Sequence, residues 1–388
     1  MEFNSQEYFS QLEMLVNIDS GFGCSDGISR IADFFEQRFQ EIGFHVQRHA
    51  GPDNTASCII ASNTTQEHYD VLFVGHMDTA FEKGEVTRSP YRTDSVNAYG
   101  PGIADMKAGT LAIYHILKCA PKELLDALSV CVIINGDEET FACFSEPLLI
   151  EYASRSDRVF VLESAFPDGS HCLQRKGRLR YELEFNGIPV HSGYVFETRN
   201  ASAILEMSHW IQVLNSLVSR EKGISFNVGL VSGGTAVSMV PAKATMAFEF
   251  RMWDVAEQTR LENTIAHMIR HPFIDGVTVK VLDSLSKPPM HPSRSTLKYV
   301  AQVTQFMEHM GYDFMVRPRG GMSDANHMFQ YTPVCIDGLG PRGELNTGHD
   351  GYESIIMDSV PECIEINLAL LQDIARRKGK KNSASFAG

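Results

Sequence analysis

The sequence predicts an α/β protein, with a mostly parallel mixed sheet flanked by helices and an inserted α+β domain. Three observations support this prediction. The stretches YDVLFVGH, LSVCVIING and DRVFVLES are apolar on both faces, as in strands that are covered on both sides. Segments with helical periodicity separate these stretches, which indicates parallel connections. The middle of the chain instead alternates apolar and charged residues, which indicates an antiparallel sheet with one solvated face.

The outer parts of the chain alternate predicted helices and strands. Ser25 is a candidate N-cap, and the apolar residues after it recur at the spacing of an amphipathic helix. The predicted helices cover residues 25–44, 105–120, 144–154 and 358–377. The predicted strands cover residues 69–76, 128–136, 157–164 and 332–340.

The middle region has the order strand, helix, strand, strand, helix, strand, which is the split βαβ or ferredoxin-like arrangement. These elements are expected at residues 178–190, 200–220, 224–234, 243–253, 255–272 and 277–283. The prolines of SKPPMHP, residues 286–292, break regular structure, so this segment is the predicted hinge back to the first domain. The length of 388 residues suits two domains. We expect a first domain made of residues 1–176 and 291–388, and an inserted domain made of residues 177–290.

The composition argues against several classes of protein. A formal net charge of −14 disfavours general nucleic-acid binding, which depends on phosphate neutralisation. No apolar stretch reaches the roughly 18 residues that a membrane-spanning helix needs. The acidic N-terminus lacks the pattern of a signal peptide. The eight cysteines are scattered and never form CxxC, which is typical of reduced thiols. We therefore expect a cytoplasmic protein that binds neither nucleic acid nor membrane.

The basic tail RRKGKKNSASFAG has no helical periodicity. We expect it to fray, as chain ends commonly do. A docking tail for an acidic partner is the alternative.

Polar side chains that bind metals follow the predicted strands. Ligands of an open parallel sheet bind beyond the C-terminal ends of its strands. Taken singly, a histidine after a strand is usually a hydrogen-bonded loop residue, and an aspartate before a helix is usually a cap. Taken together, these carboxylates would repel one another without a cation, and imidazole with carboxylate is a ligand set that zinc accepts. The residues expected at this edge are His76, Asp78, Asp105, Asp137, Glu138, Glu139, Glu163 and His349.

The segment GLGPRG matches the glycine pattern of a dinucleotide-binding loop from Gly338 to Gly343. Such a loop needs a helix directly after the glycines and an acidic residue about 20 residues further on. The segment that follows, ELNTGHDGYES, indicates a loop, and Pro341 removes a backbone amide. A dinucleotide site is therefore not favoured.

The motifs GHMDT, YGPGIADMKAG, NGDEE, VLES, HSG and GGMSDANH, in this order, resemble those of the two-zinc metallopeptidases and amidohydrolases. That family includes bacterial glutamate carboxypeptidase, aminoacylase, acetylornithine deacetylase, succinyl-diaminopimelate desuccinylase, and tripeptide and dipeptide aminopeptidases. HMDT followed by AYGPGIADMK is most similar to the glutamate carboxypeptidase branch. The resemblance implies a zinc-exopeptidase-like catalytic domain and an inserted lid or dimerisation domain.

The resemblance also implies a ligand set for two zinc ions. One ion would be held by His76, Asp105 and Glu163, and the other by Asp105, Glu139 and His349. Asp105 would bridge the two ions, and the peptide bond after it would be cis. Cobalt or manganese would also suit these ligands.

Two further carboxylates have catalytic roles in this resemblance. Glu138 would be the general base that takes a proton from water and passes it to the leaving amine. Asp78 would hydrogen-bond His76 and fix the tautomer of its ring.

The inserted domain would contribute to substrate binding. His191 would stabilise the oxyanion, often across a dimer interface, and Arg251 would bind the substrate carboxylate. Without the resemblance, these two residues indicate only a surface loop and a salt bridge. Gly320 and Gly321, with Ser323 after them, would form a substrate-facing turn, and Ser238 occupies a position where the family often has asparagine.

Two departures from the family pattern alter the surroundings of the expected site. The motif continues as DEETFACFSE, which is bulkier than the small glycine and serine run common in the family. LESA lacks the proline that often follows the acidic residue of the third strand.

We therefore expect a zinc-dependent hydrolase that cleaves an amide bond next to a free carboxylate, most similar to a glutamate carboxypeptidase. The alternative is a deacylase of N-acyl amino acids, and a second alternative is a metal-binding protein without catalysis. Glu138 argues against the second alternative, because a binding protein has no need of a base. The expected partners are a small peptide or N-acyl amino acid substrate and a second copy of the chain, bound through the inserted domain.

Overall fold

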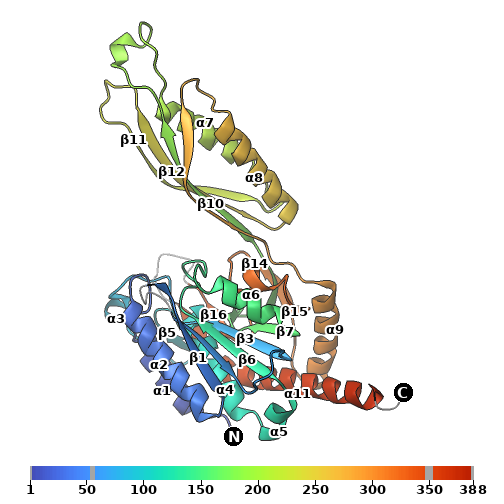
Figure 1. Cartoon of the computed structure of the whole chain (residues 1–388). Helices are drawn as coiled ribbons and strands as arrows, with labels where there is room; N and C mark the ends of the chain where they lie inside the picture. The colour runs from blue at the N-terminus through green and yellow to red at the C-terminus, as the bar shows by residue number, and fades with distance from the viewer. Residues whose placement is uncertain (1, 53–56, 346–352, 386–388) are drawn as a thin grey trace. The chain divides into compact units, whose positions relative to one another are not determined.

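The structure is a computed structural model of the chain (Figure 1), and it describes residues 2–52, 57–345 and 353–385, with side chains up to residue 379. The chain divides into two compact units. Unit 1 comprises Met1–Leu173, His291–Pro318 and Ser323–Gly388, and unit 2 comprises Gln174–Met290 and Arg319–Met322.

The centre of unit 1 is a six-stranded mixed sheet with the order β1-β2-β6-β3-β7-β15. Its strands are β1 (His45–Ala50), β2 (Ser57–Ser62), β3 (Val71–His76), β6 (Val130–Asn135), β7 (Arg158–Val161) and β15 (Val334–Ile336). β3 runs parallel to both of its neighbours, and β15 runs parallel to β7. β2 pairs antiparallel with β1 and with β6. The expected α/β class with a mixed sheet is confirmed.

The central strands of this sheet form where the sequence is apolar on both faces, so that both faces are buried in the fold. Every residue of β2, β3 and β6 is buried. Helix α4 packs against β3, α2 against β1 and β2, and α9 against β15. The helices of unit 1 are α1 (Ser5–Val16), α2 (Ser25–Glu41), α3 (Glu85–Arg88), α4 (Ala108–Cys119), α5 (Lys122–Ala127), α6 (Glu146–Ser154), α9 (Arg294–His309), α10 (Ala325–Met328) and α11 (Ser359–Ser385).

Several shorter strands complete the fold. A second sheet has the order β4-β5-β17-β16-β8, and β9 pairs with β14 in a separate two-stranded sheet. Their bounds are β4 (Arg92–Thr93), β5 (Asn97–Tyr99), β8 (Ser164–Ala165), β9 (His171–Arg175), β14 (Val316–Arg319), β16 (Gly340–Glu344) and β17 (Ser354–Ile356).

Unit 2 contains a four-stranded antiparallel sheet with the order β11-β12-β10-β13, which is the expected ferredoxin-like arrangement. Helices α7 and α8 pack on it (Figure 1), over a core that includes Leu183, Trp210 and Phe250. Side chains of alternate residues, such as Arg180, point to the opposite face. The elements are β10 (Gly177–Asn186), α7 (Ala203–Asn215), β11 (Ser225–Gly233), β12 (Lys243–Met252), α8 (Val255–Arg270) and β13 (Thr278–Lys287).

The basic C-terminal tail is helical where the structure describes it. The expected fraying is wrong for the described part of the basic tail, because α11 extends to Ser385. The tail is anchored where Arg377 donates to Gln302 at 2.8 Å and Lys378 donates to Asp70 at 2.7 Å.

Strand β16 lies within GLGPRG and its continuation, so the described backbone after these glycines is not a helix.

Candidate metal centre

The sheet of unit 1 places three predicted polar segments at one edge. β3 lies between β6 and β7 and is parallel to both, so the C-terminal ends of these strands meet. His76 is the last residue of β3, and Glu163 follows the end of β7. Glu138 and Glu139 follow the end of β6. Sequence segments that are far apart thus converge because the central strands are parallel.

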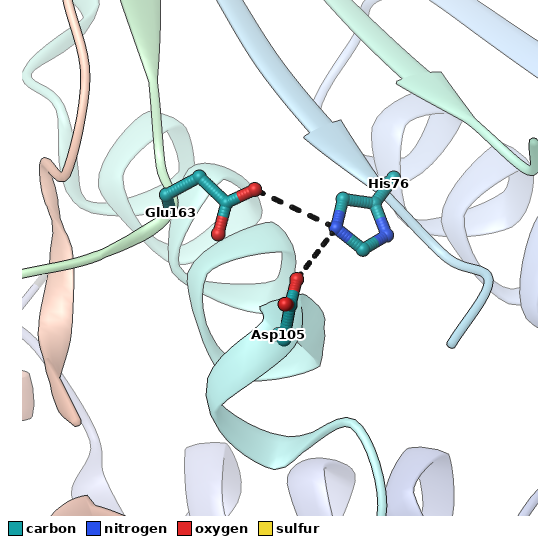
Figure 2. A group of neighbouring side chains, drawn as sticks. All are labelled: His76, Asp105 and Glu163. Atoms are coloured by element: carbon teal, nitrogen blue, oxygen red, sulfur yellow. Dashed lines mark hydrogen bonds and ion pairs between the residues drawn. The ribbon is translucent and has the colours of Figure 1, made fainter. Parts of the chain in front are cut away.

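The side chains of His76, Asp105 and Glu163 point toward one another (Figure 2). Nε2 of His76 lies 3.0 Å from Oδ1 of Asp105 and 3.7 Å from Oε1 of Glu163. One ligand atom from each of the three residues lies within 4.8 Å of the others. This is an arrangement in which one cation could contact all three residues.

Asp105 lies in the turn Ile103–Lys107, directly before α4. Its peptide bond to Met106 is cis, as the resemblance implied. Oε2 of Glu353 accepts hydrogen bonds from the amides of Ala104, at 3.2 Å, and Asp105, at 3.4 Å. Glu353 therefore fixes the backbone that presents Asp105. Sequence reasoning gave Glu353 no role, although it lies in the segment GHDGYE that contains His349.

A glycine allows α4 to approach the end of β7. A Cβ atom added to Gly109 would lie 1.8 Å from the carbonyl oxygen of Leu162. Any larger side chain would therefore push α4 away from the backbone that carries Glu163. This close approach helps to hold Asp105 and Glu163 near each other.

Asp78 connects His76 to the segment that carries Glu138 and Glu139. Its carbonyl oxygen lies 3.0 Å from Nδ1 of His76, and its Oδ1 lies 3.3 Å from the same nitrogen. The carboxylate also accepts hydrogen bonds from the amides of Glu138, at 3.2 Å, and Glu139, at 2.8 Å. One side chain thus contacts both the histidine ring and the neighbouring acidic segment.

The acidic residues at this edge carry an electrostatic cost in the absence of a cation. Burial raises the pKa of Glu138 well above its usual range, the charge of His76 opposes this shift, and the charge of Glu139 adds to it. Burial, followed by the charge of Asp105, raises the pKa of Glu139 to about 8. Burial alone would lower the pKa of His76, but its hydrogen bonds to Asp105, Asp78 and Glu163 outweigh burial and raise it.

These residues fit a metal site. The Oε1 atom of Glu139 is buried and has no hydrogen-bond partner among the residues that the structure describes. A divalent cation would offset the repulsion among Glu139, Asp105 and Glu163 and could contact such an unpaired oxygen. Histidine with carboxylates is also an accepted ligand set for zinc and related metals.

Asp324 is a further buried acid that sequence reasoning did not single out. It lies in GGMSDANH, and its Oδ2 accepts a hydrogen bond of 2.7 Å from Asn135, the last residue of β6. Burial raises the pKa of Asp324 well above its usual range. The neighbouring Ser323, expected in a substrate-facing turn, is buried and donates to Asp337 at 2.6 Å.

The predicted residues of the inserted domain lie in unit 2. Nδ1 of the exposed His191 accepts a hydrogen bond of 3.1 Å from Gly193. Nε of Arg251, near the end of β12, lies 3.1 Å from Glu249. The carbonyl of Ser238 accepts a hydrogen bond from Ser192 at 2.8 Å.

Gly320 and Gly321 lie in the segment Arg319–Met322 of unit 2, and the carbonyl of Gly321 accepts a 3.3 Å hydrogen bond from Arg175. His349 lies outside the described residues.

An edge of histidine and carboxylates on an α/β sheet, as in unit 1, is typical of one class of protein, the metal-dependent hydrolases. The chain belongs to Peptidase family M20/M25/M40, whose sequence model matches residues 72–373, more than half of the chain. The resemblance seen in the motifs is thereby confirmed, and the protein is a hydrolase of a metal-dependent family.

Individual relatives agree with this assignment. The chain is 26% identical to carboxypeptidase G2 of Pseudomonas sp. (strain RS-16) over 375 residues, which are 95% of this chain and 89% of the relative. It is 25% identical to succinyl-diaminopimelate desuccinylase of Gluconacetobacter diazotrophicus over 313 residues, which are 74% of this chain and 77% of the relative.

Solved structures share the fold. An M20 family metallo-carboxypeptidase from Sulfolobus solfataricus superimposes with a TM-score of 0.71 at 16% identity, covering 95% of this chain and 99% of that chain. A tripeptidase from Staphylococcus aureus gives a TM-score of 0.71 at 19% identity, covering 96% and 99%.

Proposed function

We propose that this protein cleaves an amide bond next to a free carboxylate, with C-terminal glutamate as the preferred leaving group. The convergence of His76, Asp105 and Glu163 beside Glu138 and Glu139 is the observation that carries the proposal. The similarity to carboxypeptidase G2 over 95% of this chain supports the choice of a carboxypeptidase.

The proposed cofactor is a pair of zinc ions. His76, Asp105, Glu139 and Glu163 would hold them together with His349. Cobalt and manganese accept similar ligands and are alternatives. When bound, two such cations lower the pKa of water and polarise a carbonyl group.

Glu138 is the proposed general base. It would take one proton from the attacking water as the water oxygen bonds to the carbonyl carbon. As the carbon–nitrogen bond breaks, Glu138 would pass this proton to the leaving amine. Burial raises the pKa of this carboxylate, and a raised pKa favours proton acceptance near neutral pH.

Unit 2 would supply the groups that bind the substrate. The forked guanidinium of Arg251 suits a substrate carboxylate, and His191 would donate to the developing oxyanion. Ser238, Gly320 and Gly321 would contact the substrate through short side chains and backbone. The hydrogen bond from Arg251 to Glu249 restrains this guanidinium.

Replacing Glu138 tests the base. Glu138→Gln keeps the shape of the side chain but removes its basicity, so activity should fall by at least about 100-fold. Metal content, measured by elemental analysis after dialysis, should stay at the wild-type value. Glu67→Gln, at an exposed position, is the matched control and should keep full activity. Hydrolysis by Glu138→Gln at the wild-type rate, with metal bound, would contradict the assignment.

A second candidate function is the deacylation of N-acyl amino acids, which the similarity to a desuccinylase favours. The two candidates differ in the part of the substrate that is recognised. A panel of N-acyl-glutamates, aryl-glutamates and acetylated amino acids separates them. Carboxyl-blocked glutamates should be poor substrates, because Arg251 would have no carboxylate to bind.

The proposed assembly is a homodimer formed through unit 2. Strand β11 lies at the edge of its sheet, and its Leu230 and Val231 are 73% and 58% exposed. An edge strand with exposed apolar residues is a common site of pairing with another chain. Light scattering should give twice the chain mass, and charged substitutions at Leu230 and Val231 should halve it.

The proposed location is the cytoplasm. None of the eight cysteines forms a disulfide bond in the structure, which is typical of a reducing compartment. Among the helices that the structure describes, none has the length and apolar character needed to cross a bilayer.

A further inference from the structure

One face of the sheet of unit 2 carries charged side chains, because α7 and α8 pack on the other face. Arg178 of β10 and Arg251 of β12 are directly opposite each other in the register of these two strands. Both side chains are half-buried, with 17% and 25% of their surface exposed. Opposite residues of an antiparallel pair lie only about 4.5–5.5 Å apart at Cβ, and like charges in such positions repel each other. Two guanidinium groups stay side by side here only if a third group holds them.

Glu249 is the group that joins the two arginines. It precedes Arg251 by two residues on β12, so both side chains point to the same face of the sheet. Oε2 of Glu249 lies 2.5 Å from Nη2 of Arg178, and Oε1 accepts a hydrogen bond of 3.1 Å from Nε of Arg251. Hydrogen bonds between charged partners are stronger than those between neutral groups. One carboxylate thus restrains two arginine side chains from neighbouring strands.

The bond through Nε determines what Arg251 can offer to a ligand. Its terminal nitrogens, Nη1 and Nη2, have no hydrogen-bond partner among the residues that the structure describes. These two nitrogens form a fork that matches the two oxygens of a carboxylate. Because Glu249 occupies Nε, the forked end of the guanidinium is the side that a second carboxylate can approach.

The electrostatics of this face also favour an anionic ligand group beside Arg251. Burial lowers the pKa of Arg178, the charge of Glu249 opposes this shift, and the charge of Arg251 adds to it. Burial likewise lowers the pKa of Lys176, and the charge of Arg251 adds to that shift. Positive charge is therefore concentrated around Arg251, where a carboxylate would be attracted.

We propose that Glu249 is a positioning residue that orients Arg251 for the substrate carboxylate, and that Arg178 in turn holds Glu249 in place. The inference deepens the proposed function and rests on it, because it assigns the groups that direct the carboxylate-binding arginine. An ion cluster that only stabilises the sheet is the alternative. That alternative predicts equal effects on substrates with and without the carboxylate.

The first test compares a substrate that has the carboxylate with one that lacks it. N-acetyl- and N-benzoyl-glutamate are measured with the zinc-loaded protein, and the faster of the two is compared with its α-carboxamide analogue. Glu249→Ala should raise KM for the carboxylate substrate by about 10-fold and change kcat by less than about twofold, because it removes binding that the ground and transition states share. On the carboxamide, kcat/KM should change by less than about twofold. Equal losses on both substrates would overturn the proposal.

Arg178 provides the test of the second half of the proposal. Arg178→Ala should raise the same KM by about 5-fold, and Arg178→Lys, which keeps the charge, should recover part of this loss. Because the two residues act through one path, the double variant Arg178→Ala with Glu249→Ala should resemble Glu249→Ala alone. Additive effects would show that Arg178 does not act through Glu249.

Two further variants serve as controls. Glu184→Gln is the matched control, since Glu184 lies on the same face of β10 and pairs with Lys243 at 2.5 Å. It should leave both kinetic constants unchanged. Glu249→Gln keeps the shape of the side chain but loses its charge, so it decides the question if Glu249→Ala does not fold. Its KM should lie between the values of the wild-type protein and Glu249→Ala, and an unchanged KM would contradict the role of Glu249.

The last test does not depend on turnover. Phenylglyoxal modifies the terminal nitrogens of arginine, and mass spectrometry reports its attachment to Arg251. Free glutamate should slow this modification severalfold in the wild-type protein, and the same glutamate concentration should give much less protection in Glu249→Gln. Equal protection in both proteins, or protection in neither, would sink the inference.

The failure of the inference and the failure of the proposed function give different results. If no glutamate amide is cleaved, the proposed function fails, and the labelling of Arg251 still decides whether Glu249 orients it toward a carboxylate. If glutamate amides are cleaved and the variants at Glu249 lose activity equally on both substrates, only the inference fails.

Discussion

Asp78 shows how one residue can organise a metal centre without belonging to the proposed ligand set. Its carboxylate accepts two backbone hydrogen bonds and lies 3.3 Å from His76. Asp78→Asn leaves one oxygen for these contacts, so one amide loses its acceptor. We expect metal affinity to fall by about 10- to 100-fold, measured by titration with a competing chelator. Asp126→Asn, at an exposed position of α5, is the control. Unchanged affinity in Asp78→Asn would show that its contacts do not position His76.

The sequence allowed part of this arrangement to be predicted. His76 ends one mainly apolar strand and Glu163 lies just after another, and parallel strands bring such residues to one edge. Asp324 and Glu353 escaped prediction because each lies in a loop without periodicity. The contact between Asp324 and Asn135 spans 189 positions of the chain, and no local pattern reports such a contact.

The loop from Asp137 to Ser145 is an element whose shape depends on one buried carboxylate. Asp137→Ala would leave the amides of Phe144 and Ser145 without their acceptor at the start of α6. Each buried amide that loses its partner costs about 1–3 kcal/mol, so the free energy of unfolding should fall by at least about 1 kcal/mol. Urea denaturation measures this change. Asp137→Asn retains one acceptor and should lose less, and equal losses in both variants would contradict this account of the loop.

Strands and helices could be predicted where their apolar pattern extended over many residues. β3 and β6 are six-residue apolar strands, and both were expected. The five-stranded second sheet was not expected, because its strands have only two to five residues and show no periodicity. Helices α1 and α9 were also missed, although Tyr8, Leu12 and Leu15 of α1 recur at helical spacing and are buried.

At the scale of the whole molecule, unit 1 is assembled from both ends of the chain. β15 follows unit 2 in the sequence, yet it pairs with β7, which precedes unit 2. The ferredoxin-like unit is therefore an insertion between two parts of one sheet. The alternation of its strands revealed this unit in the sequence, because a half-solvated sheet has a different pattern from a covered one.

The pH dependence of stability is a further property of the whole molecule, and His115 should contribute to it. This buried ring lies 2.9 Å from Gln11. Burial lowers the pKa of His115 to about 4, the charge of Glu7 opposes this shift, and Lys118 and Arg38 add to it. An unfolded histidine has a pKa of about 6.5. The folded protein therefore binds fewer protons than the unfolded chain between these values, and its stability decreases as the pH falls from about 6.5 to about 4.

Replacing His115 should remove this contribution. The shift corresponds to about 3 kcal/mol across that pH range. His115→Gln should therefore flatten the dependence of the unfolding free energy on pH between 4 and 6.5, as measured by urea denaturation at several pH values. His45→Gln, at an exposed position of β1, is the control. If the slope is the same in His115→Gln and in the wild-type protein, the folded wild-type protein must protonate His115 as readily as the unfolded chain does. The buried position of this ring on α4 would then tolerate a positive charge, which would contradict the prediction.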